Sequence, residues 1–229
     1  MTETIKLKVF RASGFDDKGK WVSYEVPFKK NMRVLDAVKY IKDNLDGSLA
    51  YRWNCGMGIC GSCAMEVNGM PVLTCKTELK QNLLGTRIGP LRAFPPVKDL
   101  VPDYAEAMKK ETVFRPWFEG KQPAGKFLSM TDEEIKLSRK FRECIECFIC
   151  SDSCRPFRDG NHAFLGPKSI VKAMAYQHHP RDEFDRSKAL AELGIWHCNV
   201  TRCCQTNCPQ GIPITDKGIL PALDASKKK

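Results

Sequence analysis

Apolar and charged residues alternate at the start of the chain. Ile5, Leu7 and Val9 are separated by lysines, and this period of two is typical of a strand with one buried face. A second apolar stretch at 21–26 follows a turn at 14–19 that contains two glycines. Together the two stretches predict a β-hairpin.

The spacing of apolar residues then becomes helical. Asn31 can cap a helix that ends near Gly47. The apolar positions of this helix are Val34, Leu35, Val38, Ile41 and Leu45. We expect all of them to face the core.

The first cysteines have a spacing that points to a metal cluster. Cys55, Cys60 and Cys63 follow the pattern C-x4-C-x2-C, and Cys75 comes after eleven further residues, which is the plant-type spacing for [2Fe-2S]. Glycines at positions 56, 58 and 61 would let a loop bring backbone N–H groups against the cluster sulfides. Paired cysteines also form zinc sites, but the x4 spacing and the glycines favour the cluster.

A short turn explains how the fourth cysteine returns to the other three. Asn68-Gly69 separates two strand-like stretches at 64–67 and 70–73, and this dipeptide is a strong signal for a two-residue hairpin. We expect the hairpin to fold Cys75 back towards Cys63.

The character of the chain changes after the prolines at 90, 95, 96 and 102. We read the stretch 87–102 as a connector between domains. Helical patterns follow within 103–142, notably at 138–142, and further helices are expected at 166–176, beginning at Pro167, and at 187–193 before Gly194. The C-terminal half is therefore predicted to be mostly α-helical.

A second group of cysteines has the bacterial-ferredoxin spacing. Three cysteines lie two residues apart and a fourth follows, and in such proteins the fourth ligates another cluster. A later group, in which Cys208 precedes Pro209, supplies the return ligand, but Thr201 stands where the template has a cysteine. The pairing gives Cys144, Cys147, Cys150 and Cys208 to a [4Fe-4S] cluster and leaves Cys154, Cys198 and Cys204 for a [3Fe-4S] cluster.

Cys203 leaves an alternative open, because it could replace Thr201 as the missing ligand. Neighbouring residues cannot easily both point at one cluster, so Cys203 is the less favoured ligand beside Cys204.

The composition supports metal ligation. The chain has 12 cysteines, no apolar signal region and no apolar run of membrane-spanning length, so we expect a protein that is soluble by itself in a reducing compartment. The formal net charge of +10 counts every thiol as neutral. Three clusters contribute about −2 each, which lowers the charge to about +4 and weakens a nucleic-acid interpretation.

Several short motifs together resemble the iron-sulfur subunit of succinate dehydrogenase and fumarate reductase. They are Cys60-Gly61-Ser62-Cys63, Asn68-Gly69, Lys98-Asp99-Leu100-Val101, Cys144-Ile145-Glu146-Cys147, Phe164-Leu165-Gly166-Pro167 and Cys208-Pro209. The resemblance implies an α+β fold: a β-grasp plant-type ferredoxin domain at 1–102 and an α-helical double-cluster domain at 103–229.

The resemblance also implies the partners. Electrons pass between FAD, covalently bound in a flavoprotein subunit, and quinone at a membrane anchor, and the chain is peripheral on the cytoplasmic face of the inner (plasma) membrane. The resemblance implies that the chain is the non-catalytic subunit of the enzyme, so no catalytic residue is assigned. His162, His178, His179 and His197 are interpreted as surface or core residues, with a hydrogen bond from His197 to the [3Fe-4S] site as the exception considered.

The chain departs from the family where many members contact quinone. Arg155-Pro156-Phe157-Arg158-Asp159 contains no tryptophan, and Asn199 rather than histidine follows Cys198. Our hypothesis is therefore a menaquinone-linked anchor of the dihaem kind, with haem b, or a cysteine-rich anchor.

Three alternatives differ in function. The first is the iron-sulfur subunit of another flavin-linked oxidoreductase, such as a soluble fumarate reductase or a glycolate-type oxidase. The second is a free-standing ferredoxin, which the missing ligand at Thr201 and the second domain disfavour. The third is a zinc-containing nucleic-acid binder, which would be colourless when purified.

Overall fold

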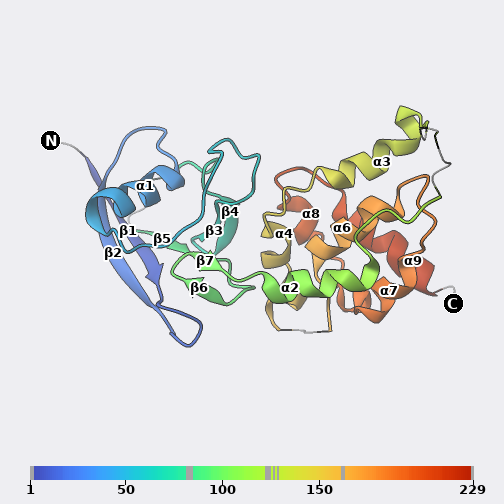
Figure 1. Cartoon of the computed structure of the whole chain (residues 1–229). Coiled ribbons are helices and arrows are strands. Elements are labelled where there is room, and N and C mark those ends of the chain that lie inside the picture. Colours follow the sequence, from blue (N-terminus) through green and yellow to red (C-terminus); the bar gives the residue numbers. More distant parts are fainter. Residues whose placement is uncertain are drawn as a thin grey trace. The chain divides into compact units, whose positions relative to one another are not determined.

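The computed structural model describes residues 3–80, 85–121, 125, 127, 129–160 and 163–227. Its contacts group into two compact units, one formed by Met1–Tyr104 with Ile145–Ser153 and the other by Ala105–Cys144 with Cys154–Lys229. All the strands belong to the first unit and most of the helices to the second (Figure 1). The predicted domains at 1–102 and 103–229 stay predictions, and the grouping of 145–153 with the first unit was not expected from the sequence.

The first unit is built on a five-stranded sheet of order β2-β1-β5-β3-β4. Strands β1 and β5 are parallel, whereas β1–β2, β3–β4 and β3–β5 are antiparallel. The strands are β1 (Thr4–Arg11), β2 (Lys20–Pro27), β3 (Ala64–Val67), β4 (Met70–Leu73) and β5 (Thr86–Gly89), and a separate ribbon joins β6 (Pro96–Lys98) to β7 (Val101–Pro102).

The predicted N-terminal hairpin is confirmed. β1 and β2 pair in an antiparallel register that places Leu7 opposite Tyr24 and Val9 opposite Val22. Ile5, Leu7 and Val9 are buried, whereas the lysines between them are exposed, as the alternation requires.

The predicted first helix is present, but its ends differ. Helix α1 spans Val34–Tyr40, and Asn31 does not cap it, because Asn31 adopts a left-handed conformation (φ 64°) before the helix begins. The backbone N–H of Val34 instead donates to the carbonyl of Thr77 at 2.9 Å. A tertiary contact therefore supplies what a side-chain cap was expected to supply.

Leu45 was wrongly predicted to be buried. A π-helical turn, η1 (Ile41–Leu45), continues from α1, and the N–H of Asp46 donates to the carbonyl of Ile41, five residues earlier. This wider turn moves Leu45 off the apolar stripe, and Leu45 is 48% exposed. The other four predicted positions are buried.

The sequence predicted that the stretch 87–102 is a connector between domains, but the structure shows that it also forms strands. It includes most of β5, the strand between β1 and β3, and it also forms the β6–β7 ribbon. Pro96 and Pro102 face each other in that ribbon, where edge positions tolerate a residue that has no N–H.

The second unit is helical, as predicted. Its elements are α2 (Ala105–Lys109), η2 (Lys110–Phe114), α3 (Asp132–Arg142), α5 (Arg155–Arg158), α6 (Pro167–Gln177), α7 (Ser187–Glu192), η3 (Ile195–His197), α8 (Cys203–Thr206), η4 (Ile214–Ile219) and α9 (Leu220–Lys227), while α4 (Ile149–Asp152) belongs to the first unit. The helices expected at 138–142, 166–176 and 187–193 are confirmed by α3, α6 and α7. None of the helices in the described residues is long and apolar enough to cross a membrane.

Sequence signals at the helix ends explain these boundaries. Thr131 and Glu134 form a capping box at the start of α3: Thr131 N–H donates to the Glu134 carboxylate at 2.7 Å, and Glu134 N–H donates to Thr131 Oγ1 at 3.2 Å. Pro167 occupies the first position of α6, and Gly194 follows α7 with φ 72°.

Candidate iron-sulfur centres

Two cysteines of the first group are brought together by the β3–β4 hairpin. Asn68 and Gly69 have φ values of 52° and 81°, as a type I′ turn requires. Thr74, at the end of this hairpin, donates both its N–H and its hydroxyl to the carbonyl of Cys63, at 3.2 and 2.8 Å. The predicted turn is therefore confirmed, and it places Cys75 beside Cys63. The side chains of these two cysteines hydrogen-bond to each other.

The other two cysteines of the first group lie in the loop before β3. The sulfur of Cys55 accepts N–H groups from Met57 at 3.3 Å, Ile59 at 3.4 Å and Cys60 at 3.4 Å. These donors, beginning with those of Met57 and Ile59, lower the pKa of Cys55 to about 6. The loop thus stabilises a thiolate, which is the form that binds iron.

Burial raises the pKa of Cys75, whereas the N–H donors lower that of Cys55. Cys63 and Cys75 are 2% and 6% exposed. Burial and the neighbouring Cys63 thiol raise the pKa of Cys75 to about 11. A bound iron would stabilise the Cys75 thiolate that burial disfavours.

The glycines of this loop have the backbone that a tight cluster loop needs. Gly56, Gly58 and Gly61 have φ values between 67° and 79°, a region that side chains disfavour. A Cβ on Gly61 would lie 2.4 Å from the carbonyl oxygen of Ile145, and one on Gly58 would lie 2.8 Å from Lys76 Cγ. The donor set and the close backbone approach fit an iron-sulfur cluster.

No three histidine, cysteine or carboxylate side chains converge on a single-ion site within the described ranges. A cluster makes a different demand, because it binds each thiolate at one of several separate irons. The N–H donors to Cys55 Sγ and the left-handed glycines of the loop meet this demand.

The two later cysteine groups have matching backbones. The second and fourth residues after Cys144 are Glu146 and Phe148, with φ 52° and 61°, and those after Cys198 are Val200 and Arg202, with φ 55° and 60°. A one-turn helix then follows in each group, α4 and α8. Left-handed conformations are rare for such residues, so the repetition marks two copies of one ligand loop.

The repeat assigns equivalent positions in the two loops. Thr201 corresponds to Cys147 and Cys204 to Cys150, whereas Cys203 corresponds to Ile149, the buried first residue of α4. The sequence had already placed Thr201 at the position of a template cysteine, but it did not reveal the repeated left-handed backbone, because no glycine or asparagine marks those positions.

The cysteines predicted for [3Fe-4S] all lie in the second unit. Cys154 and Cys204 are 5% and 4% exposed and Cys198 is half-buried. Cys198 Sγ accepts the N–H of Val200 at 3.4 Å, and Cys204 Sγ lies 3.4 Å from Thr215 Oγ1. Burial raises the pKa of Cys204 to about 11.

Cys203 is close to this group. Its thiol hydrogen-bonds with that of Cys154, which lowers the pKa of Cys203 and raises that of Cys154. The hydroxyl of Thr201 also donates to Cys203 Sγ, at 3.4 Å. The alternative in which Cys203 serves as a ligand therefore stays open for experiment.

The cysteines predicted for [4Fe-4S] come from both units. Cys147 and Cys150 are buried in the first unit. Cys144 and Cys208 belong to the second unit and are half-buried. This ligand set rests on the cysteine spacing.

The histidines that the structure describes have mixed environments. His178 Nε2 lies 2.7 Å from the carbonyl of Lys217, and His179 is buried with its ring 5.0 Å from that of Phe118. His197 is exposed and its ring hydrogen-bonds to no described residue, so its expected role at the cluster stays a prediction. His162 lies outside the described residues.

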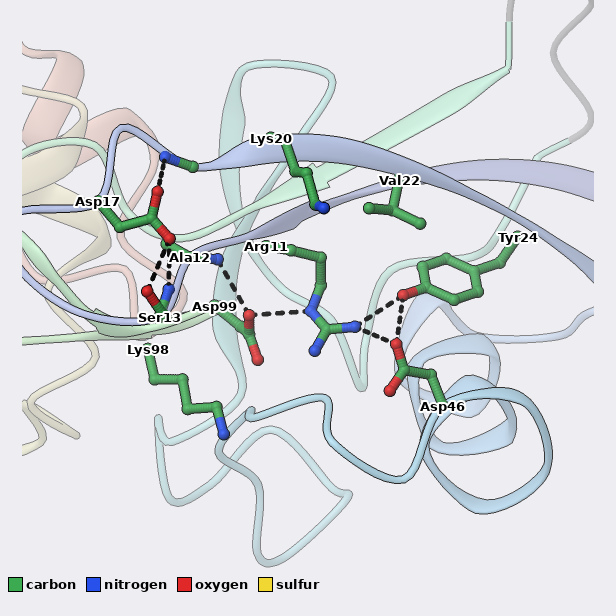
Figure 2. A pocket seen from close by; sticks show the side chains of 11 residues that line it. Arg11, Ala12, Ser13, Asp17, Lys20, Val22, Tyr24, Asp46, Lys98 and Asp99 are labelled. Atoms are coloured by element: carbon green, nitrogen blue, oxygen red, sulfur yellow. Dashed lines mark hydrogen bonds and ion pairs between the residues drawn. The ribbon is translucent and has the colours of Figure 1, made fainter.

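The Lys98-Asp99-Leu100-Val101 motif contributes Lys98 and Asp99 to a polar pocket in the first unit. Figure 2 shows Arg11 held between the Asp99, Tyr24 and Asp46 side chains. Burial alone would lower the pKa of Arg11, but hydrogen bonds to these partners raise it. Asp99 also accepts the N–H groups of Ala12 at 3.0 Å and Ala50 at 2.8 Å, so the motif fixes the loop between η1 and the cysteines.

Comparisons with known proteins agree with the cluster-binding character of the chain. Residues 6–109 match the family described as a 2Fe-2S iron-sulfur cluster binding domain, and residues 140–212 match the family described as a 4Fe-4S dicluster domain. The two matches support the predicted α+β fold and identify both cluster-binding domains.

The chain is also similar to known proteins over most of its length. A fumarate reductase iron-sulfur subunit from Mycobacterium tuberculosis is 39% identical over 198 residues, covering 83% of this chain and 79% of that protein. One subunit of a fumarate reductase (CoM/CoB) from Methanothermobacter marburgensis is 32% identical over 94% of this chain and 43% of that protein.

A solved structure has the same fold. A chain of the Mycobacterium smegmatis Sdh1 complex in the apo form superposes with a TM-score of 0.90 at 34% identity, covering 100% of this chain and 97% of that one. The chain belongs to the family of iron-sulfur subunits of fumarate reductase and succinate dehydrogenase, which are the electron-transfer subunits of that enzyme.

Proposed function

We propose that this chain conducts single electrons between the FAD of a flavoprotein subunit and quinone at a membrane anchor. The ligands are Cys55, Cys60, Cys63 and Cys75 for [2Fe-2S], Cys144, Cys147, Cys150 and Cys208 for [4Fe-4S], and Cys154, Cys198 and Cys204 for [3Fe-4S]. The observation that carries the proposal is the repeated ligand loop with Thr201 at a ligand position, because it favours a three-iron cluster beside a four-iron one.

The clusters, when bound, accept and release one electron at a time, which links the two-electron chemistry of flavin and quinone. The protein holds the thiolates, donates N–H groups to their sulfurs and keeps water from the buried ligands. Hydrogen bonds to ligand sulfurs and burial both set cluster potentials. No residue of the chain needs to act as acid, base or nucleophile.

The acceptor side of the proposal rests on the residues after Cys154. Arg155–Arg158 form α5. The ring of Phe157, in this helix, packs closely against Gly166: a Cβ added to Gly166 would lie 2.6 Å from the ring. The exposed Asn199 follows Cys198. Because Arg155–Arg158 contain no tryptophan, the proposed anchor is a menaquinone-linked one of the dihaem kind, with haem b, that holds this chain on the cytoplasmic face of the membrane. A cysteine-rich anchor is the other form of this proposal.

Low-temperature EPR of the membrane-bound complex tests the whole proposal. We expect an oxidised [3Fe-4S] signal that succinate abolishes while a reduced [2Fe-2S] signal appears. If succinate has no effect although a chemical reductant does, the clusters are present but the flavoprotein partner is a different one. Absence of an oxidised three-iron signal would indicate Cys203 as a fourth ligand.

A second candidate follows from the similarity to the CoM/CoB-type fumarate reductase. In this case the chain serves another flavin-linked oxidoreductase, such as a soluble fumarate reductase or a glycolate-type oxidase. Identification of the flavoprotein that copurifies with the chain discriminates between the two candidates.

A further inference from the structure

We infer that Gly61 is a positioning residue for electron transfer between the [2Fe-2S] and [4Fe-4S] clusters, and that its backbone contact with Cys147 is where electrons cross. The inference rests on the ligand sets of the proposed function. It adds a route and a residue that cysteine spacing does not specify.

The contact joins the neighbourhoods of two ligands that are far apart in sequence. Gly61 follows the [2Fe-2S] ligand Cys60 directly, and it lies against the main chain of Ile145 and Cys147. A Cβ built on Gly61 would be 2.4 Å from Ile145 O, 3.0 Å from Cys147 Cβ and 3.2 Å from Cys147 Cα. Two covalent segments that each end at a cluster ligand are therefore in van der Waals contact.

Only glycine permits this approach. The φ of Gly61 is 72°, and the nearest obstacle to a side chain is the backbone carbonyl of Ile145, which cannot rotate away as a flexible side chain would. Gly58 differs, because its nearest neighbour is the flexible side chain of Lys76. An alanine at position 61 must therefore push the Cys147 segment outwards.

The segment that carries Cys147 is fixed in place within the first unit. The Phe148 ring stacks on Tyr104 with centroids 4.1 Å apart and meets Phe94 edge-on at 5.2 Å. Asp152 Oδ1 accepts the N–H of Ala93 at 2.8 Å. These contacts make the Gly61–Cys147 approach a property of the packed structure rather than of a loose loop.

The step itself is the transfer of one electron. One cluster loses the electron that the other gains, and the transfer can run from the cluster at Cys60 to the cluster at Cys147 or the reverse. No covalent bond or proton changes place. Electronic coupling falls steeply when a van der Waals contact is replaced by a gap. The closeness of Gly61 to Cys147 therefore controls the rate of this step.

EPR spin relaxation of the assembled complex tests the inference. In the unaltered complex we expect faster relaxation of the reduced [2Fe-2S] signal once the neighbouring [4Fe-4S] cluster is reduced. Gly61→Ala should lose part of this enhancement and slow electron transfer between the clusters. Gly160→Ala is the matched control, because its φ of 82° gives similar strain, nothing lies within 4 Å of the added Cβ, and the residue lies outside the [2Fe-2S] loop, so the enhancement should persist.

The outcomes separate this inference from the proposed ligand sets. If iron and sulfide analysis and EPR show that the unaltered complex lacks either cluster, the proposed function is wrong. If both clusters are present without relaxation enhancement, the inference about Gly61 is wrong. An equal loss of enhancement in both variants would also contradict it, and if Gly61→Ala does not assemble, the measurement on the unaltered complex decides.

Discussion

Arg186 and Asp182 form an ion pair that is withdrawn from solvent, with Nη1 of Arg186 2.8 Å from Oδ1 of Asp182 and side-chain exposures of 0% and 1%. The guanidinium also donates to the carbonyl of Trp117 at 2.8 Å and that of Phe184 at 3.0 Å. One side chain thus joins α7 to a loop that is distant in sequence.

The first prediction concerns this pair. Arg186→Met leaves the Asp182 carboxylate buried without its partner, and such a loss costs about 3–5 kcal/mol of unfolding free energy. Chemical denaturation of the cluster-loaded protein measures it. Arg139→Met is the control, because the Arg139–Asp132 pair is exposed and should be worth less than about 1 kcal/mol. Equal losses would contradict the prediction.

The second prediction is a pH dependence at His179. Burial and the nearby Arg142 and Arg181 charges lower the pKa of His179, although Asp182 opposes them. Its Nδ1 accepts the N–H of Arg181 at 3.2 Å, so the folded state favours the neutral ring. As pH falls below the ordinary histidine pKa of 6.5, the unfolded chain binds the proton first, and stability declines until the folded-state pKa is reached.

His179→Asn tests this dependence. Asparagine can still accept the Arg181 N–H but cannot take up a proton, so the decline should shrink by about 1.4 kcal/mol for each unit by which the pKa is lowered. Denaturation midpoints across the neutral to mildly acidic range measure the effect. An unchanged pH profile would show that other groups cause the decline.

The third prediction distinguishes two adjacent cysteines. Cys204 matches a ligand of the first loop and Cys203 matches Ile149, so Cys204→Ser should abolish the oxidised three-iron EPR signal, whereas Cys203→Ser should retain it. Iron content per chain provides an independent count. Loss of the signal in the Cys203 variant alone would reverse the assignment.

The fourth prediction concerns the missing ligand. Thr201 occupies the position that corresponds to Cys147, and its residue neighbours have the same left-handed backbone as those of Cys147. Thr201→Cys should therefore convert the [3Fe-4S] site into a four-iron site, with loss of the oxidised three-iron EPR signal and a lower midpoint potential. Thr206→Cys, in the same short helix region but off the ligand pattern, should change neither.

Several features followed from the sequence because their causes are local. Asn68-Gly69 specifies its turn through the backbone conformations that these two residues tolerate. The alternation from Ile5 to Val9 specifies which face of β1 is buried. Cysteine spacing identified the cluster-binding character of the chain, because ligation constrains neighbouring residues directly.

Other features were decided by contacts between distant residues. The Thr77 carbonyl satisfies the first turn of α1, so Asn31 is not needed as a cap. A π-turn, which no residue type announces, exposes Leu45. Residues 87–89 joined the five-stranded sheet as part of β5, because β5 completes the pairing between β1 and β3.

The sequence by itself determined the two kinds of cluster-binding domain and the order of the local elements, since both depend on residues close together in the chain. Tertiary structure alone decided that Ile145–Ser153 packs with the first unit, that Gly61 touches Cys147 and that Arg186 reaches Trp117. Such contacts form because they allow burial, close packing and paired hydrogen bonds over the whole unit. These requirements do not produce a regular spacing of residues in the sequence.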